Sequence, residues 1–222
     1  MSDIFDAMSE TTPAATRVLR PIGHERQARK SERTREAILA SALAFFRDHP
    51  FRDLTVGELM ARVGASRPTF YQYFGDMHEL MAVLLEGVRT DILMAASPWF
   101  EGEGDPVAEL KVSLAGLVDV CYQRGNLLRA VSDAAVSNAN MEKAWTRFMS
   151  SFDDTVAARI EQHQAKGVID SFPARPVAVA LNRLDASLLI ESFGRRPRAN
   201  RDDVLAAITR IWCSTLYKVS GD

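Results

Sequence analysis

The chain has 222 residues, of which 47% are hydrophobic and 25% are charged, and its formal net charge at pH 7 is −2. This composition is typical of a globular protein with a full core. Because the net charge is slightly negative, the chain is not a protein that binds nucleic acid through a positive charge spread over its whole surface. Two cysteines, Cys121 and Cys213, are too few for a disulfide framework and form no CxxC metal motif, and no run of about 18 apolar residues indicates a membrane span.

Residues 1–30 are predicted to form a disordered basic leader. Its first part is rich in Thr, Ala and Pro and has no apolar segment of the kind that a signal peptide needs. Residues 17–35 hold seven basic and two acidic side chains, which gives a local charge of +5. Such a run is either a solvated lead-in to a helix or an arm that contacts DNA phosphates. Together with the free cysteines, these features lead us to expect a cytoplasmic protein.

Residues 31–76 are predicted to form a domain of three helices. Apolar side chains at helical spacing predict the first helix over about 31–48, and Pro50 stops it. The buried face of this helix is expected to carry Ile38, Ala42, Phe45 and Phe46.

A second, short helix is predicted over 55–63. Thr55 and Glu58 have the spacing of a capping box, in which each side chain satisfies the other residue's free backbone N–H. Gly64 then stands where the end of a helix needs a positive φ.

A third helix is expected to begin at Ser66, which can cap it, and to end near Phe74 and Gly75. Pro68 is tolerated in its first turn. Two short helices joined by a tight turn, after a longer first helix, form a helix-turn-helix pattern. In that motif the second short helix enters the major groove of DNA, and its N-terminal residues face the base edges.

The remainder, residues 77–222, is predicted to be helical as well. A capping box formed by Asp76 and Glu79 opens one long helix, which Pro98 and the loop at Gly102–Gly104 are expected to terminate. Asp105–Pro106 opens the next, which Gly125–Asn126 is expected to break. Apolar periodicity predicts four further helices, at 127 to about 137, from about Trp145 to Gly167, and around 177–188 and 204–216. No segment alternates like a strand, so the predicted fold class is all-α with nine helices.

The start of the third helix carries the side chains best suited to reading DNA. These are Ser66, Arg67, Pro68 and Thr69. An arginine can donate two hydrogen bonds to guanine, and a threonine methyl can touch thymine. Gln72 can reach a base or a phosphate.

Four aromatic residues follow within five positions. Phe70 and Phe74 lie four positions apart, so they share one helix face and are expected in the core. Tyr71 and Tyr73 are expected to project away from it, where their hydroxyl groups can donate hydrogen bonds to phosphate oxygens.

Two long segments resemble the TetR family of bacterial transcriptional regulators, namely REAILASALAFF and LTVGELMARVGASRPTFYQYFGDMHEL. Within the second, SRPTFYQYF is similar to the subgroup that includes the mycobacterial ethionamide-resistance regulator. Near the C-terminus, ALNRLDASLLIESF and RIWCSTLY resemble the last two helices of that subgroup.

The resemblance implies an N-terminal helix-turn-helix DNA-binding domain and a C-terminal helical domain for effector binding and dimerisation. It implies a homodimer through the last two helices, bound to an inverted-repeat DNA operator, with recognition helices roughly 34–36 Å apart or somewhat more. A repressor released by a small, largely apolar effector is expected. The residues expected to contact DNA are Arg33, Thr55, Ser66, Arg67, Pro68, Thr69, Tyr71, Gln72 and Tyr73.

The effector is expected in a cavity of the C-terminal domain. Candidates for its apolar wall are Leu114, Trp145, Phe148, Phe152 and Trp212. The resemblance adds Asn182 as a polar anchor, because related regulators carry a cavity-facing asparagine there. A second asparagine is common three residues later, where this chain has Asp185. An acid facing the cavity would favour a ligand with a donor or a positive charge.

Two departures from the family concern DNA binding. Met60 replaces a usual small alanine, and Met77–His78 replace a frequent phosphate-contacting lysine. The basic segment before the first helix can supply the missing positive charge.

Other functions fit the sequence less well. No GxSxG, HExxH, P-loop or GxGxxG motif occurs, the four histidines lack metal-site spacing, and Asp153–Asp154 is interpreted as a solvated helix face. We therefore expect no enzyme, no cofactor and no metal site. A helical ligand carrier without a DNA target would lack the basic N-terminal segment and the third helix's Arg67 and tyrosines. Two alternatives of the same fold stay open, namely an activator and a regulator that has lost its effector.

Overall fold

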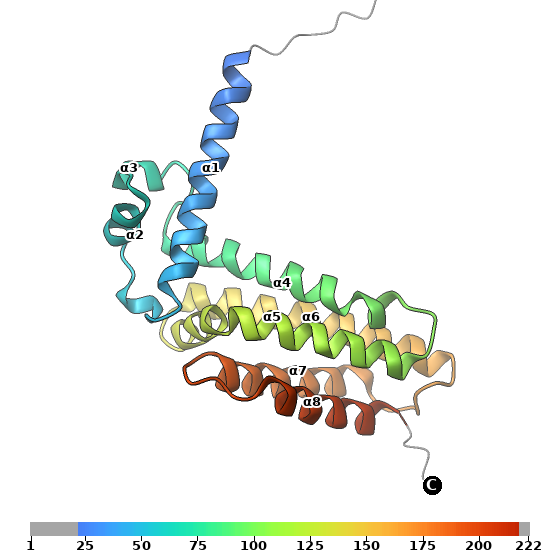
Figure 1. Cartoon of the computed structure of the whole chain (residues 1–222). Coiled ribbons are helices and arrows are strands. Elements are labelled where there is room, and N and C mark those ends of the chain that lie inside the picture. The colour runs from blue at the N-terminus through green and yellow to red at the C-terminus, as the bar shows by residue number, and fades with distance from the viewer. Residues whose placement is uncertain (1–21, 218–222) are drawn as a thin grey trace, which may run out of the picture. The chain divides into compact units, whose positions relative to one another are not determined.

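Residues 22–217 are described by the computed structural model of the chain, with side chains described from Gln27 onwards. This part contains eight α-helices, one short 3-10 helix and no β-strand, which confirms the all-α prediction (Figure 1). The elements are α1 (Ile22–Phe45), η1 (Phe51–Asp53), α2 (Val56–Val63), α3 (Arg67–Phe70), α4 (Met77–Glu101), α5 (Pro106–Ala135), α6 (Ala139–Ala165), α7 (Ala174–Phe193) and α8 (Arg201–Leu216). None of the helices in this range is long and apolar enough to cross a bilayer.

The first helix begins earlier than expected. α1 starts at Ile22 rather than near Ser31, so residues 22–30 of the predicted leader are helical, whereas residues 1–21 lie outside the described part. The segment HERQARK has no apolar stripe, which is why periodicity missed it, but most of its residues favour helix intrinsically. The chain divides into two compact units inside α1, one ending at Glu36 and the other beginning at Ala37.

The caps of α2 agree with the prediction except that the capping box is half formed, because the Glu58 carboxylate accepts from Arg62 at 3.1 Å instead of from the Thr55 backbone N–H. The Thr55 side chain accepts a hydrogen bond from the Glu58 backbone N–H at 3.2 Å, and Gly64 at the C-cap has a φ of 75°. Leu59 and Met60 lie on the buried face of this helix. The chain then turns directly into α3.

α3 is shorter than predicted. It ends at Phe70 rather than near Phe74, and residues 71–73 form turns. The backbone N–H of Phe74 still donates to the Phe70 carbonyl at 3.1 Å, so this phenylalanine stays one helical turn from Phe70.

α4 ends at the predicted Gly102–Gly104 loop, with Gly102 as its C-cap, but Pro98 lies within the helix and does not help to end it. The helix continues to Glu101. A proline leaves the carbonyl four residues earlier without its helical partner. Here that carbonyl belongs to Met94 and accepts a hydrogen bond from the Ser97 hydroxyl at 2.9 Å, which helps the helix to tolerate the proline.

The predicted break at Gly125–Asn126 is wrong, because α5 is one continuous helix. Gly125 is buried, and a Cβ atom there would lie 2.7 Å from the backbone carbon and oxygen of Phe193 at the end of α7. The glycine therefore permits a close helix contact rather than ending the helix. The described part has eight α-helices as a consequence, where the sequence predicted nine.

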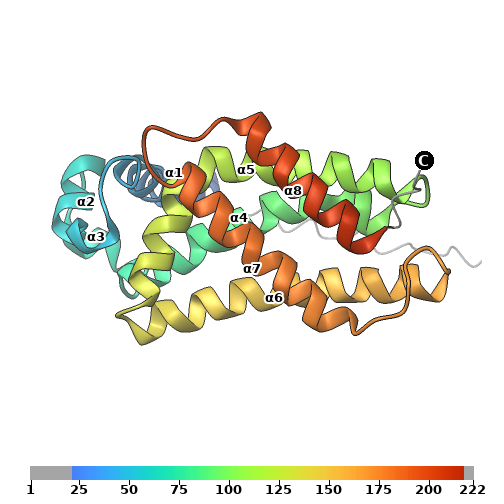
Figure 2. The same cartoon turned by 90° about the horizontal axis from the view of Figure 1, so that it is seen from below.

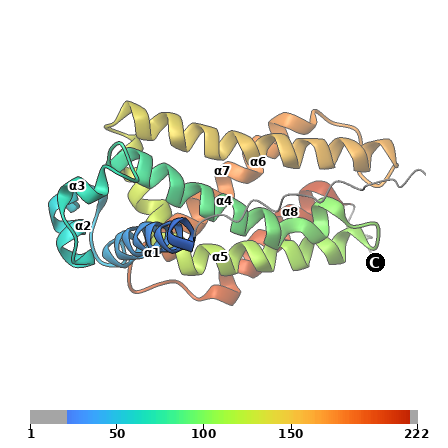
Figure 3. The same cartoon turned by 90° about the horizontal axis from the view of Figure 1, so that it is seen from above.

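Helices α4 to α8 form three layers. α4 contacts α5 and α6, both of these contact α7, and α5 also contacts α8. Viewed from above, α4 lies over the space between α5 and α6 (Figure 3). Viewed from below, α7 and α8 cross in front of the other helices, and no other helix covers their outer side (Figure 2).

Candidate functional site

The helix-turn-helix presents polar side chains at the start of α3. Ser66, Arg67 and Pro68 are exposed and Thr69 is half-buried. The hydroxyl oxygens of Ser66 and Thr69 lie 2.9 Å apart and share a hydrogen bond, which fixes both side chains locally. Ser66 thus occupies the N-cap position, but its side chain bonds to Thr69 and caps no backbone N–H.

Two buried phenylalanines anchor this edge. Phe70 and Phe74 are 0% and 1% exposed, and their ring centroids are 5.5 Å apart. Tyr71 projects from the surface with 60% of its area exposed. Tyr73 differs from the prediction, since it is half-buried and packs against the core. The reason is that it follows the end of α3, where helical periodicity no longer sets its direction.

Arg67 lies across α2 at Gly57. A Cβ atom at Gly57 would be 2.3 Å from a terminal guanidinium nitrogen of Arg67, so only glycine leaves this space open. Gly57 was not identified from the sequence, because its role depends on a neighbour in the next helix. Gln72 and Thr55 are also exposed on this part of the structure.

The remaining residues discussed for DNA binding are one basic side chain and the two departures from the family pattern. Arg33 is exposed on the part of α1 that belongs to the first unit. His78, at the place of the family's lysine, lies 3.5 Å from an Asp76 carboxylate oxygen. Met60 is 1% exposed, so the helix-turn-helix core accommodates this larger residue.

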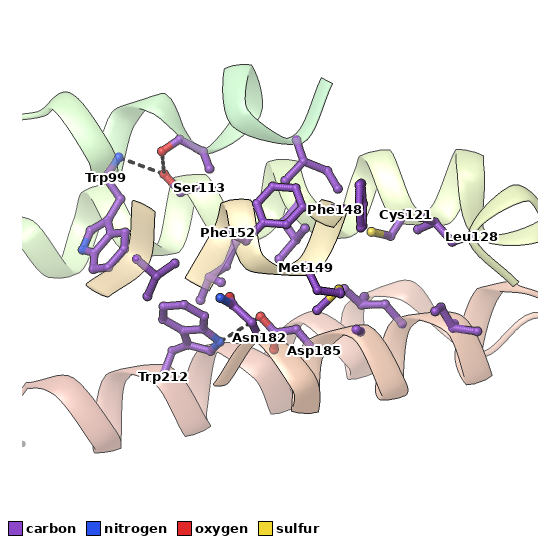
Figure 4. Close-up of a pocket in the computed structure, with 18 of the residues that line it drawn as sticks. Trp99, Ser113, Cys121, Leu128, Phe148, Met149, Phe152, Asn182, Asp185 and Trp212 are labelled. Carbon is purple, nitrogen blue, oxygen red and sulfur yellow. Dashed lines mark hydrogen bonds between the residues drawn. The ribbon is translucent and has the colours of Figure 1, made fainter. Parts of the chain in front are cut away.

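A cavity of about 90 Å³ lies inside the C-terminal bundle, and helices α4 to α8 all line it (Figure 4). The six residues predicted for the effector site are all among its lining side chains: Leu114, Trp145, Phe148, Phe152, Asn182 and Trp212. Aromatic rings form much of the wall. Phe148 stacks on Trp145 with centroids 5.4 Å apart and meets Phe152 edge-on at 5.0 Å.

Sequence reasoning missed the contribution of α4 to this wall. Trp99 and Phe100 line the cavity but were not among the predicted wall residues. Ser113 of α5 fixes this segment, because its hydroxyl accepts from the Trp99 backbone N–H at 2.9 Å and donates to the Ala96 carbonyl at 3.1 Å (Figure 4).

The buried Asp153 carboxylate, which pairs with the exposed Arg183, orients Asn182. Its side-chain amide donates to Asp153 at 2.9 Å, and the same carboxylate pairs with Arg183 at 2.9 Å. Asp153 is only 2% exposed, so its assignment to a solvated face is wrong, whereas the adjacent Asp154 is exposed. Consecutive residues of a helix point in different directions, so Asp153 faces the core and Asp154 faces solvent. The sequence pair alone does not show which of the two is buried.

Asp185 does face the cavity. It is 5% exposed, and the Trp212 indole N–H donates to its Oδ2 atom at 3.0 Å (Figure 4). Its Oδ1 atom is buried and accepts no hydrogen bond from any described residue. Burial raises the pKa of this carboxyl from 3.8 to about 7, although the Trp212 hydrogen bond lowers it in part. Burial also raises the pKa of the neighbouring Cys121 thiol to about 12.

Comparisons with known proteins match both the N-terminal and the C-terminal part of the chain. Residues 38–84 match the family described as bacterial regulatory proteins, tetR family, and residues 110–218 match the C-terminal domain of transcriptional regulator EthR. The HTH-type transcriptional regulator EthR of Mycobacterium tuberculosis is 31% identical over 212 residues, which cover 93% of this chain and 98% of the relative. The chain belongs to the TetR family.

Other TetR-family proteins extend this comparison. EthR of Mycolicibacterium smegmatis is 25% identical over 218 residues, which cover 95% of each chain. A crystal structure of a TetR-family regulator from Syntrophomonas wolfei superimposes with a TM-score of 0.72 at 20% identity, and covers 81% of this chain and 93% of that one.

TetR membership settles the class of function. The relatives are named as HTH-type transcriptional regulators, and regulators of the TetR family are DNA-binding proteins, not enzymes. Within the described residues, no three His, Cys, Asp or Glu side chains gather in a way that would hold a metal ion. The TetR match spans the helix-turn-helix, and the EthR match spans the α5 to α8 part of the cavity wall.

Proposed function

We propose that the protein is a homodimeric repressor that leaves an inverted-repeat operator when a small, largely apolar effector occupies the cavity. The observation that carries this proposal is the exposed polar edge of α3, held from behind by the buried rings of Phe70 and Phe74. Residues 31–76 serve as the DNA-binding domain and residues 77–222 as the effector-binding and dimerisation domain. A regulator of this kind works in the cytoplasm, where the DNA is.

Arg67 and Thr69 read base edges in the major groove, with Ser66 and Pro68 beside them. Tyr71 and Gln72 are exposed and bond to the backbone of the operator. The half-buried Tyr73 contributes chiefly through its hydroxyl group at the phosphate backbone. Thr55 lies at the N-terminus of α2, where the helix dipole favours a phosphate. Arg33 adds positive charge from α1.

Dimerisation uses the outer faces of α7 and α8. Half-buried apolar side chains on these helices would continue the core across a two-fold axis: Val177, Leu184, Leu188, Leu205 and Ile211. A dimer makes two sets of base contacts at once, which raises affinity and demands an inverted repeat.

The effector acts through α4. This helix begins immediately after the helix-turn-helix, and its far half lines the cavity with Ile92, Ala96, Trp99 and Phe100. The free cavity is about 90 Å³, whereas ligand sites usually measure roughly 300–1,000 Å³. An effector therefore favours a wider arrangement of the bundle, and release follows if that arrangement spaces the two recognition helices poorly for DNA.

Selection of bound fragments from random and genomic DNA tests this function. The proposal expects enrichment of an inverted repeat that binds two protomers. Reporter expression from such a site should rise when the protein is deleted, whereas a fall would identify an activator. Retention of fragments without any shared repeat would contradict the proposal.

A further inference from the structure

The cavity wall holds few polar side chains, and hydrogen bonds within the protein already occupy most of their donors. Ser113 both accepts and donates a hydrogen bond. The Asn182 amide nitrogen is held by Asp153, and the Trp212 indole N–H is held by Asp185. Oδ1 of Asp185 differs from these groups, because it is buried and has no partner among the described residues.

An unpartnered carboxylate oxygen in an apolar cavity is costly, because burial removes its hydration and nothing replaces it. The nearest arginine in sequence does not compensate for it. Arg183, on the same helix, is engaged with Asp153 through two hydrogen bonds at 3.2 and 2.9 Å. The missing partner of Asp185 is thus a hydrogen-bond donor, preferably a charged one.

We propose that the effector is a compact apolar amine whose ammonium group donates a hydrogen bond to Oδ1 of Asp185. Its hydrocarbon part lies against the aromatic wall formed by Phe148, Phe152 and Trp212. This inference rests on the proposed function, since it takes this cavity as the effector site. A basic amine fits better than a neutral donor because it satisfies the oxygen and also neutralises the buried charge.

The geometry makes amine binding depend on pH. Cys121 of α5 is the other titratable side chain in the wall, and burial keeps it a neutral thiol. The wall residues from α4, α6 and α8 do not titrate, and Asp153 behind Asn182 is paired with Arg183. Asp185 alone, with its pKa of about 7, must lose its proton for an ammonium ion to bind. As the pH increases toward 7, the affinity for the amine should rise about tenfold per pH unit, and above pH 7 it should level off.

Isothermal titration of the full-length dimer with three probes of similar shape tests the inference. The probes are 2-phenylethylamine, 2-phenylethanol and propylbenzene. At about pH 8 the amine should bind roughly tenfold to a hundredfold more tightly than propylbenzene, as expected for a hydrogen bond between charged groups. Asp185→Asn should abolish this preference, whereas Glu191→Gln, an exposed carboxylate on the same helix, should leave it intact.

Equal binding of amine and hydrocarbon, no amine binding at all, or an amine preference that survives in Asp185→Asn would overturn the inference. Should that variant fold poorly, the wild-type pH profile decides instead, and a flat affinity between about pH 6 and pH 8 counts against Asp185. A parallel measurement of operator release separates the two proposals. Release by propylbenzene but not by the amine refutes only the inference. Amine binding that depends on Asp185 but leaves DNA binding unchanged refutes release by this cavity.

Discussion

Replacing Asp185 by asparagine should make the stability of the protein less dependent on pH. The folded-state pKa of about 7 lies above the reference value of 3.8, so the folded protein holds this proton more tightly than the unfolded chain. Below a pH of 3.8, Asp185 is protonated in both the folded and the unfolded protein, and burial of the neutral carboxyl costs little. Between the two values the wild type loses stability as the pH rises, by about 1.4 kcal/mol per pH unit, and above pH 7 the full cost of roughly 4 kcal/mol is present.

Asparagine keeps an oxygen that can accept the Trp212 hydrogen bond and carries no charge. Denaturant unfolding of both proteins at one protomer concentration, followed by circular dichroism, should show the variant gaining about 2 kcal/mol on the wild type between about pH 5 and pH 7. Glu161→Gln, which changes an exposed carboxylate on α6, serves as the control and should show no such gain. A stability difference between the Asp185 variant and wild type that stays constant over this range would refute the reasoning.

Three further substitutions test the other sites. Tyr71→Phe should weaken binding to all DNA sequences about equally, which competition with operator and random fragments measures; a loss confined to the operator would identify Tyr71 as a base reader instead. Gly57→Ala should leave the folded state intact but displace the Arg67 guanidinium, and so weaken operator binding without lowering the unfolding midpoint. Gly125→Ala should destabilise the protein by about 1–3 kcal/mol, because the added methyl group meets the Phe193 backbone, and an unchanged urea midpoint would contradict this contact.

Local chemistry made much of the fold predictable. Thr55, Asp76 and Asp105 were each identified as N-caps, and each accepts a backbone N–H at the start of its helix. Capping depends only on residues within one turn, so the sequence carries the whole signal. Gly125 was misread because the feature that explains it, the Phe193 backbone, is distant in sequence.

In the candidate sites, too, features set by neighbouring residues were predictable, and features set by residues distant in sequence were not. Aromatic and long apolar residues at helical spacing identified five lining residues of the cavity, since such side chains point to the bundle interior, and the family resemblance added Asn182. Trp99 was missed because it follows Pro98, which was expected to help end the helix. Asp153 was missed because its partners Asn182 and Arg183 come from another helix. The orientation of Asp185 likewise depends on Trp212 of α8, which no pattern around Asp185 reveals.

The central claim is that the start of α3 reads base edges. Once an operator is selected, its affinity should be measured with every single base-pair substitution in one half-site, for the wild type and for Arg67→Ala. We expect the variant to lose discrimination at one base pair by about 1–3 kcal/mol and to keep its other preferences. A profile that keeps its shape at every position, or that weakens uniformly, would contradict base reading by Arg67.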